Sequence, residues 1–166
     1  MATLTAKIVV ALTAKLASAL DLQQAESTLN ENYVTSLSNG TGQNQANMEF
    51  SDTRSLSPSA SENLDLAGGL TSPLGGTITF TKIKAIFIKA ASTNTGNLKV
   101  GEGITNAFVG PFGASAVGLT IPPGGELLLT APLDGWTVTP ATGDLLKVEN
   151  LVAAAAAYDV VLIGTV

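Results

Sequence analysis

The side chains that carry most enzyme chemistry are missing from this sequence. Its 166 residues include neither histidine nor cysteine. Histidine is the commonest general base and a frequent metal ligand, and cysteine is a common nucleophile. Only a serine or threonine beside a lysine could replace them, and neither an S-x-x-K nor a G-x-S-x-G pattern occurs. These absences argue against an enzyme.

The acidic residues do not form a promising site either. Glu62 and Asp65 are close in sequence, but residues three apart in a strand face opposite sides of it. We therefore expect solvated acids rather than the converging pair of a glycosidase. The amide-rich segment 39–47 could offer oxygen ligands to calcium, yet no carboxylate follows before Glu49 and the D-x-D-x-D-G spacing is absent. The sequence thus predicts no catalytic residue, no metal site and no cofactor.

The charge content indicates which partners the protein can take. Charged residues make up 13% of the chain, about half of the usual quarter. A surface with few ions loses little hydration energy when another subunit covers it, so the composition favours assembly. The net charge is −5, and Lys82, Lys84 and Lys89 form the only basic cluster. We therefore expect no nucleic acid as a partner.

No segment is typical of membrane insertion or targeting. Lys7 and Lys15 interrupt the apolar residues at the start of the chain, and the longest apolar run, 152–158, is far shorter than a membrane span. We expect a soluble protein that works without a membrane.

The first residues alternate between apolar and polar types. Leucine, isoleucine, valine and alanine occupy the even positions from Leu4 to Leu22 except Ser18, whereas threonine, lysine and aspartate occupy many of the odd ones. This period of two predicts a long strand with one buried face. A helix is the rival interpretation, because Leu4, Ile8, Leu12 and Leu16 are also spaced four apart. We favour an N-terminal β-arm over residues 1–22, with Leu4, Ile8, Val10 and Leu12 as candidate interface residues.

The remaining residues, 23–166, are predicted to form a single β-sandwich or jelly-roll-like domain, so that the fold is all-β. Residues 23–48 are mostly polar, with a short candidate strand from Tyr33 to Leu37 and a hairpin turn signal at Asn39-Gly40. The strongest strand pattern covers 77–92, and its apolar residues change face near 82–84, which indicates a bulge or a strand covered on both sides. Later strands, separated by Gly/Pro turns at the spacing typical of sandwiches, are predicted at 97–100, 107–109, 118–121, 126–130, 136–139, 145–150 and 158–165.

Two aromatic residues outside the arm are further interface candidates. Trp136, the single tryptophan, follows a glycine turn and fits either the end of the core or a contact with a sugar or another chain. Phe112 lies in the apolar loop Pro111–Gly113, where exposure would indicate a subunit contact.

Four stretches of the sequence resemble small virion proteins of tailed bacteriophages. They are SNGTGQNQANMEFSDTRSLSPSASENLDLAGGL, FTKIKAIFIKAAS, NAFVGPFGAS and the closing DLLKVEN…AAYDVVLIGTV. The resemblance covers about residues 37–166 and is to β-sandwich decoration (cement) or tail-associated subunits. It carries over no functional residues, because such proteins act through surfaces.

The resemblance implies a virion structural protein, with a capsid decoration (cement) protein as the favoured role. Such a protein would be assembled in the host cytoplasm, would bind the major capsid protein on the capsid surface, and would associate with copies of itself, a homotrimer being favoured. A tail, connector or fibre-associated subunit and a carbohydrate-binding adsorption module are the alternatives.

Overall fold

The computed structural model describes residues 3–103 and 105–166. These residues form an all-β protein with 60% of the chain in strands and no helix, so none of them belongs to a helix that could cross a membrane. The strands are β1 (Ala6–Ala19), β2 (Gln24–Asn39), β3 (Gln45–Ala46), β4 (Met48–Leu56), β5 (Ser61–Asp65), β6 (Ala67–Thr71), β7 (Thr77–Thr79), β8 (Lys82–Ala90), β9 (Leu98–Gly101), β10 (Gly118–Ile121), β11 (Glu126–Thr130), β12 (Trp136–Thr137), β13 (Leu145–Asn150) and β14 (Ala156–Thr165).

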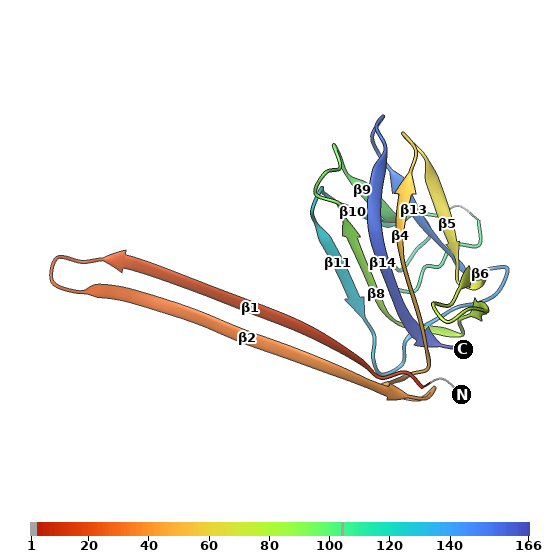
Figure 1. The fold of residues 1–166 in the computed structure, drawn as a ribbon, viewed down its shortest axis with the longest axis horizontal. Coiled ribbons are helices and arrows are strands. Elements are labelled where there is room, and N and C mark those ends of the chain that lie inside the picture. Colours follow the sequence, from red (N-terminus) through yellow and green to blue (C-terminus); the bar gives the residue numbers. More distant parts are fainter. Residues whose placement is uncertain (1–2, 104) are drawn as a thin grey trace.

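Strands β1 and β2 form a long hairpin that projects from the rest of the molecule, as Figure 1 shows in red and orange. Their antiparallel register runs without a break from Ala6 opposite Leu37 to Ala19 opposite Gln24. The strand interpretation of the first residues is therefore confirmed over the helix.

The arm is wider than the segment 1–22, because β2 lies beside β1 along its whole length. The short strand predicted from Tyr33 to Leu37 is thus only the end of a strand of 16 residues. Its polar residues form a strand because the ladder to β1 uses main-chain groups, whatever the side chains are. The chain turns after Asn39 as predicted, but the residues that follow pair parallel to β2, as β3, and do not form a hairpin.

The body consists of two main sheets that enclose one core. One, which we call sheet C, has the order β11-β8-β14-β4 with β12 beside β8; the other, sheet D, has the order β10-β9-β13-β5. The antiparallel pairs are nested along the chain: β4 pairs with β14, β5 with β13, β8 with β11 and β9 with β10. Buried side chains from both sheets form the core cluster, among them Ile86 and Leu162 from sheet C and Val100 and Leu146 from sheet D.

The predicted strand 77–92 is divided in two. Residues Thr77–Thr79 pair with β6, whereas β8 begins at Lys82 beside β14. The irregularity expected near 82–84 is found there: Ile163 lies opposite Ala85 and the next residue, Gly164, opposite Ile83, so Lys84 is the extra residue of a bulge in β8. A Cβ atom at Gly164 would collide with the carbonyl oxygen of Lys82, so this close approach requires glycine.

The other predicted strands are largely confirmed, with one exception. β9, β10, β11, β13 and β14 lie within a residue or two of the ranges predicted for them. The segment 107–109 is not a strand, because Ala107 forms only a single bridge, to Leu145.

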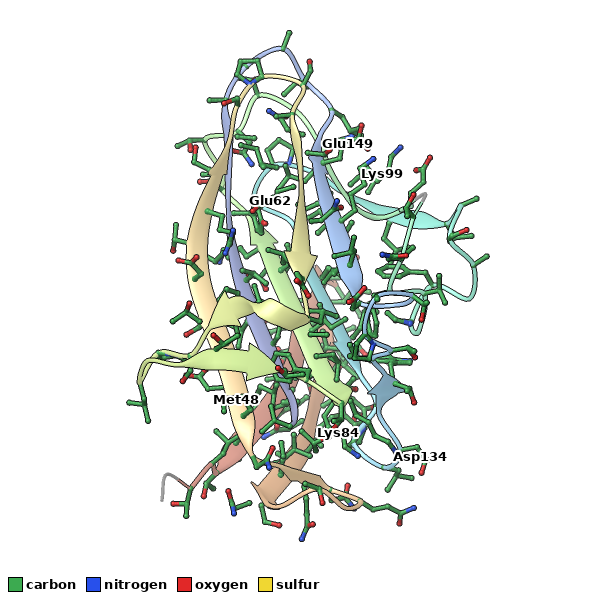
Figure 2. All side chains as sticks on the ribbon, turned by 90° about the vertical axis from the view of Figure 1, so that its right-hand side faces the viewer. Met48, Glu62, Lys84, Lys99, Asp134 and Glu149 are labelled. Atoms are coloured by element: carbon green, nitrogen blue, oxygen red, sulfur yellow. The ribbon has the colours of Figure 1, made fainter. Side chains whose placement is uncertain are left out.

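The two sheets are also linked by a polar cluster around Glu62 of β5. Arg54 of β4 donates a hydrogen bond of 2.6 Å to one carboxylate oxygen of Glu62, and the hydroxyl of Tyr158 of β14 donates one of 2.8 Å to the other. Burial, followed by the hydrogen bond to Glu62, raises the pKa of Tyr158 well above its ordinary value. Glu62, expected to be solvated, therefore joins sheet D to sheet C, and Figure 2 labels it within the body.

Lys84 of β8 is a buried charged residue, with 1% of its surface exposed. Its ammonium group donates hydrogen bonds of 2.7 Å to the carbonyl oxygen of Leu133 and 3.3 Å to that of Pro132. Figure 2 shows Lys84 and Asp134 close together at one end of the body. Burial lowers the pKa of Lys84, Lys82 lowers it further, and Asp134 opposes both. Lys84 thus holds the loop after β11 against the sheet.

We expect Lys84→Met to lower the free energy of unfolding by about 1–3 kcal/mol, because the carbonyl of Leu133 loses its donor. In the folded protein the pKa of Lys84 lies below the ordinary 10.5. Between these two pKa values the unfolded chain binds a proton that the folded protein has released. The contribution of Lys84 to the free energy of unfolding therefore grows as pH rises through this range. Urea unfolding at several alkaline pH values measures this difference. Lys82→Met is the matched control, and an equal loss in both variants would contradict the role of Lys84.

Candidate interaction surface

The register of the arm separates its side chains into two unlike faces. The even-numbered residues of β1 lie opposite the odd-numbered residues of β2, and together they form one face of the hairpin. This face carries the larger apolar residues, with Glu31 as its one charged residue. We call these residues the arm strip: Ile8, Val10, Leu12, Leu16, Leu29 and Tyr33. The other face carries Lys7 and the ion pair of Lys15 with Glu26, at 2.7 Å, and is the more polar one.

Nothing in the described part of the chain covers the outer arm strip. The exposed fractions are 54% for Leu12, 76% for Leu16 and 60% for Tyr33. The face expected to be buried is therefore open to solvent beyond Ile8. Exposed apolar surfaces of this extent are typical of sites that contact another protein, a membrane or a ligand.

The root of the arm, in contrast, is fixed to the body. Leu37, at the inner end of the apolar face, is 1% exposed. The amide of Asn44 donates to the carbonyl of Pro132, at 2.9 Å, and the amide of Asn47 donates to that of Gly164, at 3.0 Å. Pro132 belongs to the loop that Lys84 also binds, so the same loop contacts both the buried lysine and the root of the arm.

A second apolar surface lies on the outer face of sheet C, beside the root. Leu128 and Val161 flank Phe87 in register on the neighbouring strands. We call these residues, with Ala85 and Ile163, the sheet patch. Between the sheet patch and residues 7–9 of the arm is a groove of about 230 Å³. Figure 1 shows the arm leaving this end of the body and pointing away from it.

The structure brings together only part of the predicted interface residues. Ile8, Val10 and Leu12 belong to the arm strip. Leu4 is half-buried just before β1, and its amide donates a hydrogen bond of 3.0 Å to the side-chain oxygen of Asn39. Phe112 is 9% exposed and belongs to the core cluster, so the exposure that would indicate a contact there is not found.

Trp136 lies apart from the arm strip, with one side packed against the core. A Cβ atom at Gly110 would collide with its side chain, so the indole lies directly on that glycine. Trp136 also lines a shallow hollow of about 410 Å³, together with Thr137, Thr139 and Thr142. An aromatic side chain beside three hydroxyls is a surface that a sugar could contact.

The sequence interpretation missed half of this surface. Leu16 follows the even-numbered pattern of β1 and could have been included. Leu29 and Tyr33 lie in the polar segment 23–48, where their odd spacing carries little signal without the register of β2. The sheet patch was missed because β8 is apolar on both faces, and such a pattern does not indicate which face lies toward solvent.

In residues 3–103 and 105–166 no group of three or more acidic side chains comes together that could hold a metal ion. Comparisons with known protein families, with curated proteins and with solved structures found no match to this chain. The resemblance to phage virion proteins therefore depends on the sequence stretches quoted above.

We expect Leu37→Ala to loosen the root of the arm, because burial of its side chain fixes β2 to the body. Trypsin should then cut faster after Lys7 and Lys15, while the body melts cooperatively. Leu29→Ala, at an exposed site of the arm, is the matched control. Limited proteolysis followed by mass spectrometry measures the cuts, and equal rates in the two variants would show that Leu37 does not anchor the arm.

Proposed function

We propose that this chain is a structural protein of a bacteriophage virion, a capsid decoration (cement) protein that binds the major capsid lattice and stabilises the head. The observation that carries the proposal is the arm strip, an apolar surface on a projecting hairpin with no partner inside the described chain. A surface of this kind serves assembly better than catalysis. The homotrimer stays the favoured form of self-association.

The order of the body strands supports the same proposal. The nested pairs β4·β14, β5·β13, β8·β11 and β9·β10 are the arrangement that a jelly roll has, in which eight strands form two four-stranded sheets. Jelly rolls are common in viral capsid proteins, although lectins and enzymes use the fold as well. The fold is therefore compatible with the proposal and does not by itself decide it.

A tail, connector or fibre-associated subunit would use the same arm, and copy number separates it from a cement protein. One or a few copies per capsomer are expected of cement, whereas a handful of copies per particle would place the protein elsewhere. Quantitative mass spectrometry of intact particles gives this number.

A carbohydrate-binding adsorption module is the second candidate function, because of the hollow beside Trp136. Its hydroxyls come from threonines, and no charged side chain lines it. Glycan binding by the isolated protein that Trp136→Ala abolishes, with the sandwich still folded, would favour this function.

We expect a variant with a shortened arm to lose its binding to expanded capsids. Removing β1 alone would leave β2 without its partner, so both strands should be cut in register. Residues 11–32 are deleted, and Val10 and Tyr33, which are opposite each other, are joined by an Asn-Gly turn. The body should keep its melting temperature, since the deleted residues do not belong to its core. Co-sedimentation with capsids measures the binding.

The control for this experiment is Thr13→Glu in the complete arm, which adds charge to the polar face at the same distance from the root. It should bind as the parent protein does. Unchanged binding by the shortened variant would exclude the arm as the capsid contact.

A further inference from the structure

We propose that the arm strip of one copy docks on the sheet patch of a second copy of this chain. This inference rests on the proposed function in one respect, that the arm serves assembly, and it names the surface that receives the arm. The receiving site is the groove formed by Phe87, Leu128, Val161 and Ile163 with the first residues of the receiving copy's own arm.

The arm cannot cover the sheet patch of its own copy. Only residues 7–9 reach the groove, and from there the hairpin runs away from the body (Figure 1). The pairing of β1 with β2 continues without irregularity to Ala19, so the described arm has no bulge at which it could fold back. The strip and the patch of one copy can therefore be covered only by another molecule.

The two surfaces match in chemistry. Glu31 is the one charged residue on the face that holds the arm strip, and the sheet patch contains no charged residue. Glu49, opposite Ile163 on β4, borders the patch and forms no ion pair among the described residues, whereas Lys89, further along the same sheet face, lies 2.8 Å from Glu126. Docking thus buries mainly apolar side chains, and the lone charges that it approaches are Glu31 on the arm and Lys7 and Glu49 beside the patch.

The groove also offers a charge that is complementary to the arm. Lys7 lines it and forms no ion pair within the part of the chain that the structure describes. An arm from a second copy that lies in the groove brings its Glu31 into the region of this lysine. The contribution of such an exposed pair is small, but it favours one orientation of the arm.

The arm strip and the sheet patch differ in size. From strand dimensions, the arm face measures roughly 45 by 10 Å and the sheet patch roughly 15 by 15 Å, so one contact covers at most about 225 Å² of each surface. A reciprocal pair would bury about 450 Å² per copy, below the roughly 600–1,000 Å² per partner of stable complexes, so we expect a weak, concentration-dependent association. A ring of three copies, each with its arm on the next, covers the same surfaces.

The first experiment measures self-association of the full chain by sedimentation velocity across a range of concentrations. We expect a closed oligomer, and at least tenfold weaker association for Leu12→Glu on the arm strip and for Leu128→Glu on the sheet patch. The matched controls are Thr13→Glu, on the opposite face of β1, and Leu119→Glu, on an edge strand of the other sheet; both should associate as the parent does. Circular dichroism and thermal melting confirm that each variant is folded.

The second experiment identifies the contact directly. Because the chain has no cysteine, Leu16→Cys and Val161→Cys can be introduced in separate chains, mixed and joined with a short bis-maleimide. A cross-linked product that contains one chain of each kind supports docking between copies. Leu16→Cys mixed with Leu119→Cys is the control and should give no such product.

A parent chain that remains monomeric at all concentrations would overturn this inference, and so would an oligomer that Leu128→Glu leaves intact without the mixed cross-link. Neither result decides the proposed function, because a monomer can still bind capsids through its arm. Conversely, an oligomer that forms as described but never binds capsids would contradict the proposed function and leave the docking of arm on patch standing.

Discussion

A two-stranded ribbon can satisfy its main-chain hydrogen bonds by itself but cannot bury its own apolar side chains. The ladder between β1 and β2 pairs the residues of both strands from root to tip. Its side chains have no second layer to pack against, so Leu12, Leu16 and Tyr33 remain in water. Isolated hairpins are marginally stable for this reason. The arm therefore depends on a rigid root within the chain, and its apolar face is left open to a partner of the kind proposed above.

The body supplies the rigid root through contacts that are distant in sequence. The nested pairing places β4 and β14 side by side although about 100 residues separate them, and such pairs form late because closing long loops costs entropy. Gly164, at the end of β14, then accepts the amide of Asn47, just past the arm. The loop that receives Asn44 is itself held by Lys84. The position of the arm thus depends on the last strand of the chain and on one buried lysine.

The sequence was sufficient for much of this fold, and the failures have physical causes. Alternating residues predicted β1 correctly, because side chains on a strand alternate between its two faces, but the burial of one face that went with this prediction is not found, since β1 is exposed on both faces beyond Ile8. The polar β2 escaped prediction, since neither of its faces packs on the body beyond Leu37 and its side chains carry no burial signal. Phe112 was read as a loop tip, yet it packs beside Gly101, which no local pattern reveals. The arm strip could be predicted only for β1, and the sheet patch not at all, because both depend on strand order and register.

The ion pairs show how the few charged residues of the chain are distributed. Of the eight basic residues, Lys15, Arg54, Lys89, Lys99 and Lys147 each lie within 3.3 Å of an acidic oxygen, and Lys84 binds main-chain carbonyls inside the body. Six of the thirteen acidic residues take part in these ion pairs, so the charge that remains unpaired among the described residues is mainly negative, in keeping with the net charge of −5. Hydroxyl and apolar side chains make up much of the rest of the surface, and these lose little hydration when they are covered. A low charge content that would be a risk for a freely diffusing protein is an advantage for one whose arm strip and sheet patch are covered by neighbours, as we propose.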